Sequence, residues 1–142
     1  LTTLLALAKD MDVAAVVIEG APYDFRTLVK EELQVKKYPT WMAGLMPTVV
    51  RWHTGVTLGS PPPALGVTKA RHLMVITSPE DKRVHQHHSS WIIADAARQK
   101  VPFTVLPVMG DHKMARFHDI ATYKKHVVGY FRRHLMLHPR KT

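Results

Sequence analysis

The chain has 142 residues, of which 46% are hydrophobic and 22% are charged, a composition typical of one globular domain. It contains no cysteine, which excludes disulfide bonds, thiolate metal sites and cysteine nucleophiles. The net charge is +9 at pH 7, and no apolar run approaches the roughly 20 residues that cross a bilayer, so we expect no membrane span.

The first half of the chain predicts two helices around one strand. Residues 1–10 have a helical apolar stripe without an N-cap, which we interpret as a helix whose upstream chain is missing. The apolar run at residues 13–22 ends in Gly and Pro and predicts a strand buried on both faces. Residues 38–69 are interrupted by proline and glycine and predict an irregular segment. Between these two, residues 23–37 predict an amphipathic helix whose stripe is formed by Phe25, Leu28, Val29 and Leu33.

The second half of the chain predicts two more strands, each followed by a helix. Residues 71–77 predict a second buried strand, and residues 101–109 predict a third strand. The final helix is predicted at residues 119–137, with one apolar face and one strongly basic face. Its apolar face holds Ile120, Tyr123, Val127, Tyr130, Phe131, His134 and Leu135. Between the two strands, residues 89–100 predict a helix whose buried side holds Ile92, Ile93, Ala96 and Ala97.

Strands that alternate with helices predict an α/β fold with a parallel sheet and right-handed crossovers. Residues 1–142 would form a single partial domain, with the irregular loop at 38–69 and a basic C-terminal helix and tail at 119–142. Three strands are few for such a sheet, and an open apolar edge strand promotes aggregation. We therefore expect a sheet that is incomplete on its own, with a protein partner covering its open edge.

Two predicted strand ends carry residues of a hydrolytic relay. Asp81 follows the second predicted strand, and His112 follows the third. Functional groups gather at the carboxyl ends of parallel strands, and an Asp then a His on consecutive ends is the second half of a serine-hydrolase relay. The His takes a proton from a serine hydroxyl, while the Asp fixes the imidazole tautomer and stabilises the imidazolium. Asp81 could alternatively be a turn carboxylate paired with Lys82 or Arg83. His112 could alternatively be a loop histidine bonded to Asp111 or to backbone.

These segments resemble the C-terminal part of an α/β-hydrolase, nearest to the prolyl oligopeptidase and oligopeptidase B group of serine peptidases. "HLMVITSPEDKRV" is similar to the strand and turn that bear the catalytic Asp of that family. "MGDHKMARFHDIATYKKHVVGYFRRHL" is similar to its His loop and closing helix, and "LTTLLALAKDMDVAAVVIEGAPYDFRTLV" to the helix after the nucleophile and the next strand. The resemblance implies an α/β-hydrolase fold with Asp81 as the acid and His112 as the base. This relay calls for no cofactor.

The sequence departs from the family pattern at the nucleophile. The family carries its serine in a G-x-S-x-G elbow before the helix that residues 1–10 resemble, and this chain has no such elbow. Lys113 stands where the family has a small residue, and its side chain would crowd a substrate. A relay without a nucleophile performs no acyl transfer, so we expect no activity from this chain alone. The serines present, none of them in such an elbow, are Ser60, Ser78, Ser89 and Ser90.

A histidine run and several aromatic residues invite other interpretations. His85, His87 and His88 have side chains that bind Zn, Cu or Ni in proteins, but their spacing matches no closed metal site. We interpret them as a solvated, partly cationic turn and expect no metal. Core packing is a better interpretation than base stacking for the four aromatic candidates, which are Tyr23, Trp41, Trp52 and Trp91.

The end of the chain carries most of the net positive charge. Residues 112–142 hold eight Lys or Arg and one acidic residue, Asp119. Such a segment indicates either contact with a polyanion such as RNA or a solvated helix face. The residues expected to make that contact are Lys124, Lys125, Arg132, Arg133, Arg140 and Lys141.

We favour a catalytically incomplete, hydrolase-like protein that serves as a structural subunit of a larger assembly. A mitochondrial ribosome or another ribonucleoprotein would suit a basic chain without cysteine, and no secretory signal opens the sequence, so we expect an intracellular and mitochondrial location. The alternative is the C-terminal segment of an active prolyl-oligopeptidase-like serine peptidase or hydrolase, whose nucleophile lies on a missing segment or a second chain. A free-standing binding module fits poorly, because three strands with an uncapped first helix bury too little surface.

Overall fold

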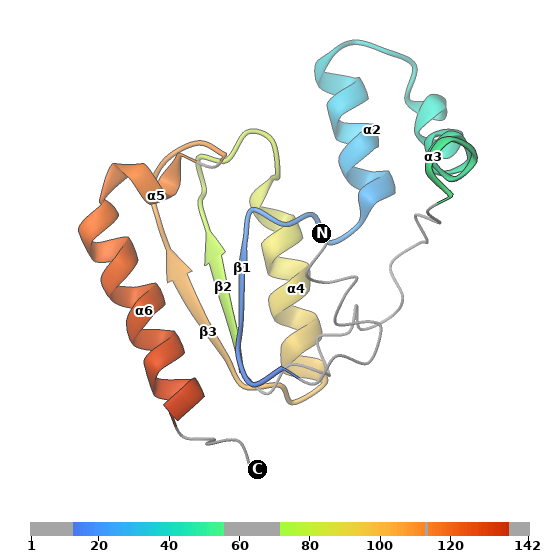
Figure 1. Ribbon diagram of the computed structural model, residues 1–142. Coiled ribbons are helices and arrows are strands. Elements are labelled where there is room, and N and C mark those ends of the chain that lie inside the picture. Colours follow the sequence, from blue (N-terminus) through green and yellow to red (C-terminus); the bar gives the residue numbers. More distant parts are fainter. Residues whose placement is uncertain (1–12, 56–71, 113, 137–142) are drawn as a thin grey trace.

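A computed structural model describes residues 13–55, 72–112 and 114–136 of the chain. Three strands within these ranges form one parallel sheet in the order β1-β2-β3 (Figure 1). The register pairs β1 with β2 and β2 with β3 so that all three strands end at the same edge of the sheet. The predicted α/β class with three parallel strands is confirmed. The strands are β1 (Val16–Glu19), β2 (Leu73–Thr77) and β3 (Phe103–Pro107).

Helices cover both faces of the sheet and give the molecule three layers. α4 (Gln86–Arg98) packs on one face and α6 (Ile120–Met136) on the other (Figure 1). Side chains of β2 enter two separate cores, because successive residues of a strand point to opposite faces. The core beneath α4 contains Val16, Ile18, Leu73, Val75, Ile92 and Ala96, and the core beneath α6 contains Met74, Ile76 and Tyr130.

Tyr130 joins α6 to the sheet. Its hydroxyl donates a hydrogen bond to the carbonyl oxygen of Val16 on β1, at 3.3 Å. Burial raises the pKa of Tyr130 to about 12, because the phenolate would lose its hydration. The side chain therefore remains a hydrogen-bond donor throughout the physiological pH range.

The outer strands are shorter and more exposed than the sequence predicts. β1 spans four residues instead of 13–22, and burial alternates along it, with Val16 and Ile18 buried and Val17 half-buried. β3 is the opposite edge strand, and Phe103 and Val105 on it are exposed. Among the described strands only β2 has a neighbour on each side, which explains why it is buried along nearly its whole length.

α2 (Phe25–Val35) confirms the predicted helix at 23–37, although it begins two residues later and ends two residues earlier. Asp24 caps it, since its carboxylate accepts the backbone N–H groups of Arg26 at 3.2 Å and Thr27 at 3.0 Å. No residue of α2 is fully buried, so the predicted apolar stripe is only half covered. The reason is the position of α2, which stands away from the sheet (Figure 1).

The prediction of an irregular segment at 38–69 is wrong for its first part. A 3-10 helix, η1 (Thr40–Gly44), and the helix α3 (Met46–Thr54) follow α2. Pro47 lies in the first turn of α3, where a missing backbone N–H costs nothing, so this proline starts a helix instead of breaking one. Gly55 ends α3 in the left-handed conformation, with φ of 68°. Residues 56–69 lie outside the described part of the chain.

The helices of the second half agree with the prediction more closely. α6 confirms the predicted helix at 119–137, although Ile120 and Leu135 at its two ends are exposed. A short α5 (Ala115–His118), which the sequence did not predict, precedes it. α4 begins at Gln86, before its predicted start, and Ala97 on it is exposed because it faces away from the sheet. The helix predicted at 1–10 lies outside the described residues, and no described helix is long and apolar enough to cross a membrane.

Replacing Leu73 with Ala should lower the free energy of unfolding by about 2–5 kcal/mol, because the side chain is fully buried and its truncation leaves a cavity. The matched control is Leu135→Ala, whose side chain is 52% exposed and whose loss should cost less than about 0.5 kcal/mol. Urea denaturation measures both values. Equal losses in the two variants would contradict the position of β2 at the centre of the sheet.

Candidate active site

Asp81 and His112 meet at the carboxyl edge of the sheet. Asp81 lies in the turn after β2, and His112 lies in the loop after β3. Nδ1 of His112 and Oδ2 of Asp81 are 2.8 Å apart, the distance of a charge-assisted hydrogen bond. The ring nitrogen that faces a carboxylate carries the proton, which leaves the lone pair of Nε2 available to a substrate or nucleophile. The structure therefore brings together the two side chains that the sequence singled out.

The carboxylate of Asp81 is oriented by its own turn. Oδ1 accepts the backbone N–H groups of Arg83 at 2.9 Å and Val84 at 2.8 Å, while Oδ2 faces His112. Only 8% of Asp81 is exposed. The alternative of a surface ion pair with Arg83 does not hold, because the Arg83 side chain lies 3.6 Å from Glu32 instead. Asp81 is thus a buried carboxylate fixed by three N–H donors.

Hydrogen bonds between the two loops hold this pair in place. Ser78 Oγ donates to the carbonyl of Gly110 at 2.6 Å, and Glu80 Oε2 accepts the N–H of Gly110 at 2.7 Å. Asp111 Oδ1 accepts the N–H groups of Lys82 at 3.0 Å and of His112 at 2.7 Å. The backbone N–H of Lys82 has the largest effect, and together with that of His112 it holds the pKa of Asp111 below its ordinary value. We name these contacts the loop clamp.

Gly20, at the end of β1, makes room for the His112 ring. A Cβ added at Gly20 would lie 3.0 Å from Cε1 and 3.2 Å from Nδ1 of His112. The φ of Gly20 is +51°, in the region that side chains rarely adopt. All three strand ends therefore contribute to the position of His112: β1 by its glycine, β2 by Asp81 and β3 by the loop itself.

A hollow of about 280 Å³ opens beside His112. Its walls come from α2 and from the two clamped loops, and they carry charges of both signs. This volume is just below the range of about 300–1,000 Å³ that is usual for small-molecule sites. Besides His112 it is lined by Glu31, Glu32, Val35, Lys82, Arg83, His85 and Asp111.

No described serine is placed to act with His112. Ser78 Oγ donates to Gly110, and Ser90 Oγ donates to the carbonyl of Gln86 at 3.3 Å. Ser89 is buried in α4. Across residues 13–55, 72–112 and 114–136, no hydroxyl makes a hydrogen bond with His112. Ser60 and Lys113 lie outside those ranges.

The expectation of a solvated turn is wrong for His88, because α4 begins at Gln86 and carries the His88 ring inward, whereas His85 precedes the helix. His88 is fully buried, and this burial lowers the pKa of its imidazole, because the charged ring would lose its hydration. Its Nδ1 accepts the backbone N–H of Tyr23 at 3.2 Å, and its Nε2 lies 3.3 Å from Glu31 Oε2. His87 Nε2 lies 2.8 Å from the other oxygen of Glu31. Glu31 therefore ties α2 to α4.

The same three side chains have the donor types of a metal site. Ligand atoms of Glu31, His87 and His88 lie within 4.8 Å of one another. However, the N–H of Tyr23 occupies the Nδ1 lone pair of His88, so the Nε2 of the neutral ring carries the proton. A metal on that Nε2 would require the lone pair and would break the bond to Tyr23. The cluster is better suited to joining α2 and α4 than to holding an ion.

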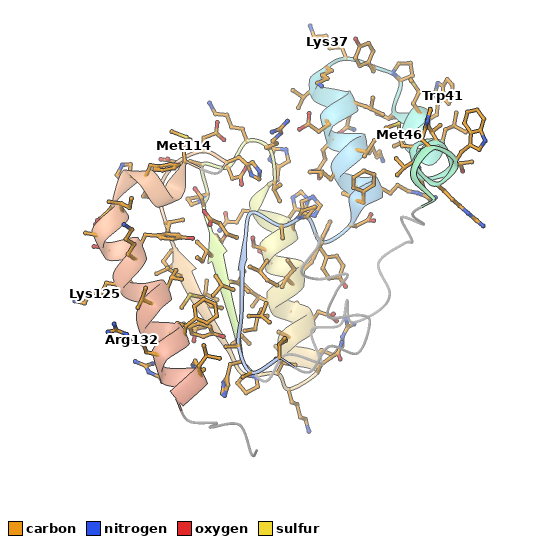
Figure 2. All side chains as sticks on the ribbon, in the orientation of Figure 1. Lys37, Trp41, Met46, Met114, Lys125 and Arg132 are labelled. Atoms are coloured by element: carbon orange, nitrogen blue, oxygen red, sulfur yellow. The ribbon has the colours of Figure 1, made fainter. Side chains whose placement is uncertain are left out.

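The expected polyanion-binding residues lie on one helix. Lys124, Lys125, Arg132 and Arg133 are all exposed on α6. Figure 2 shows Lys125 and Arg132 on the side of α6 that faces away from the sheet. Arg140 and Lys141 lie outside the described residues.

The expectation of core packing is wrong for two of the tryptophans. Trp41 is 69% exposed and Trp52 is 85% exposed, because η1 and α3 project from the sheet. Trp91 is also partly exposed and packs edge-on against Tyr23, with 5.9 Å between the ring centroids.

Sequence reasoning missed three residues that shape the site, namely Gly20, Glu80 and Glu31. Gly20 had a signal, since a glycine at the end of a buried strand often marks a close approach of backbone to another group. Glu80 and Glu31 had none, because nothing local to a carboxylate reveals which distant N–H or imidazole it will meet.

Comparison with known proteins identifies the fold. No protein-family model matches the chain, and no curated protein matches it. Among solved structures, the chain is similar to an esterase from Pyrococcus furiosus, with a TM-score of 0.61 over 93% of this chain and 12% sequence identity. The chain spans about half of that esterase, 48% of its length. The α/β-hydrolase type of fold is thereby confirmed, whereas the comparison does not single out the prolyl oligopeptidase group.

Replacing Asp81 with Asn should change the tautomer of His112 from Nδ1–H to Nε2–H. Oδ1 accepts two backbone N–H groups, so the amide oxygen must take that position and the amide NH₂ must face Nδ1. Nitrogen-15 NMR of the imidazole measures the tautomer. The matched control is Asp111→Asn, whose amide oxygen can accept the same backbone bonds and should leave the tautomer unchanged. An unaltered His112 tautomer in the Asp81 variant would contradict the contact.

Proposed function

We propose that this chain carries the acid and the base of a serine-hydrolase relay, in a protein that hydrolyses esters or amides. The proposal rests on the hydrogen bond between His112 Nδ1 and Asp81 Oδ2, which joins residues 31 positions apart. A buried carboxylate that orients an imidazole with a free Nε2 is the arrangement that general-base catalysis requires. The likeness of the fold to that of an esterase supports the same class of reaction.

In the proposed reaction, Nε2 of His112 accepts the proton of a serine hydroxyl as the serine oxygen attacks the substrate carbonyl. Asp81 stabilises the imidazolium that results. His112 then gives this proton to the leaving oxygen or nitrogen, and an acyl-serine remains. Water attacks the acyl group with His112 again as the base, which releases the acid and restores the serine. No cofactor takes part.

The nucleophile is assigned to a residue outside the described ranges, to another segment of the protein or to a second chain. A structural subunit, which the sequence favoured, would need neither a buried carboxylate with three N–H donors nor a glycine that makes room for an imidazole. The buried carboxylate and the glycine therefore favour the alternative, which is a working hydrolase. A peptidase of the prolyl oligopeptidase type, implied by the sequence resemblance, is the narrower form of the proposal.

The full-length protein should react with a fluorophosphonate probe, and His112→Ala should slow labelling by about 10²–10⁴-fold, because the general base is lost. The matched control is His126→Ala, an exposed histidine of α6, which should label at the original rate. Hydrolysis of 4-nitrophenyl acetate and of a prolyl 4-nitroanilide then separates esterase from peptidase. Absence of labelling, or labelling that survives His112→Ala, would refute the proposal.

Contact with RNA through α6 is a second candidate function. The observation that favours it is the exposed basic face of α6, which belongs to a segment with eight Lys or Arg and one acidic residue. Lysine and arginine contacts with phosphates release counterions, so such binding weakens steeply as salt increases. A subunit of a ribonucleoprotein, including a mitochondrial one, would use this face.

Replacing Lys124 and Lys125 with Gln should weaken binding to single-stranded RNA and lower the slope of log K against log salt by roughly 1.4, about 0.7 for each lost contact. Filter binding over a range of salt concentrations measures this slope. Arg26→Gln with Lys30→Gln on α2 removes the same charge from another exposed helix and should change the slope little. Equal effects of the two pairs would show that only the net charge matters.

A further inference from the structure

The helices after β1 form a projection with an apolar end. α2 runs away from the sheet, and η1 and α3 return beside it (Figure 1). We name residues 36–53, which comprise the turn after α2, η1 and most of α3, the hairpin tip. Ala43 is its one buried residue, whereas its large apolar side chains are exposed. They are Tyr38, Trp41, Met42, Leu45, Met46, Val49 and Trp52.

The hairpin tip exposes more large apolar side chains than is usual for a surface that contacts only water. Single exposed apolar residues are normal, but a run of seven on one projecting element marks a contact surface. Trp52 is 85% exposed, and its indole lies against the ring of the neighbouring His53, with 5.4 Å between the ring centroids. Burial of the two indole rings against a partner surface would be favourable, because aromatic side chains contribute strongly to interface energetics.

The charges of the hairpin tip indicate the chemistry of the partner. Lys36, Lys37 and Arg51 are exposed there, and the sequence has no Asp or Glu between Glu32 and Glu80. Figure 2 shows Lys37 and Trp41 on the part of the hairpin that is remote from the sheet. Tryptophan and tyrosine with flanking lysine and arginine is the composition that favours the boundary between lipid headgroups and acyl chains.

We propose that the hairpin tip docks on an anionic lipid surface, with Trp41 and Trp52 inserted at the headgroup level and the three cations facing lipid phosphates. The proposed contact reaches the depth of the lipid headgroups, and no described helix is long and apolar enough to cross a bilayer. A second copy of the chain is the weaker choice of occupant. A symmetric contact between two hairpin tips would bring together two surfaces that each carry Lys36, Lys37 and Arg51 and no acidic residue, and surfaces of like charge repel each other.

The full-length protein should sediment with vesicles that contain phosphatidylglycerol and much less with vesicles of phosphatidylcholine alone. Trp41→Ser with Trp52→Ser should reduce binding by about tenfold or more, because the inserted aromatic area is lost. Lys36→Gln, Lys37→Gln and Arg51→Gln should each reduce binding to the anionic vesicles by about fivefold. The matched control is Val128→Ser with Leu135→Ser, two exposed apolar residues of α6, which should leave binding unchanged.

Tryptophan fluorescence gives a second readout that does not depend on activity. The chain has three tryptophans, so a Trp91→Phe protein reports only on Trp41 and Trp52. Its emission should shift to shorter wavelength with anionic vesicles and stay unshifted without them.

Three results would overturn the proposal. One is vesicle binding that is absent, or that survives loss of both tip tryptophans. Another is binding that disappears with Lys124→Gln and Lys125→Gln but not with the tip variants, since α6 would then make the contact. The third is a dimer that Trp41→Ser with Trp52→Ser dissociates in size-exclusion chromatography, which would assign the surface to a second copy.

Discussion

The in-register pairing of β2 with both of its neighbours is the constraint on which the rest of the structure depends. Because β2 and β3 are parallel and begin in register, the turn that holds Asp81 and the loop that holds His112 leave the sheet at the same edge. A slip of one residue would move one loop by about 3.3 Å along the strand and turn its side chains to the opposite face. The loop clamp, in which Gly110 is bonded by both Ser78 and Glu80, depends on that register.

The molecule combines a rigid centre with a projecting arm. At the centre, backbone N–H groups orient Asp81, and the two cores on either side of β2 hold the strand ends. The helix α2, which leads to the hairpin tip, is held to α4 by Glu31, whose two carboxylate oxygens face Nε2 of His87 and Nε2 of His88. A catalytic site requires side chains that are held rigidly, as Asp81 is, whereas a contact surface requires exposed side chains, as the hairpin tip has.

The hollow beside His112 and the hairpin tip adjoin each other along α2. α2 lines the hollow beside His112 with Glu31, Glu32 and Val35, and the hairpin tip begins at the next residue, Lys36. A lipid surface bound at the tip would therefore adjoin the element that forms one wall of the hollow. The basic face of α6 lies on the other side of the sheet from α4 (Figure 1). A polyanion bound there would not compete with the hollow.

The sequence by itself determined the fold class, most of the regular elements and the two strand ends at which Asp81 and His112 lie. Hydrophobic periodicity is a local property, and Asp81 and His112 are recognisable because each follows a predicted strand. Only the tertiary structure decided that these two side chains touch, that His88 is buried, and that Trp41 and Trp52 are exposed. The physical reason is that a periodic pattern shows which side of an element is apolar but not whether another element covers it. Pairing between strands, which is non-local, makes that decision.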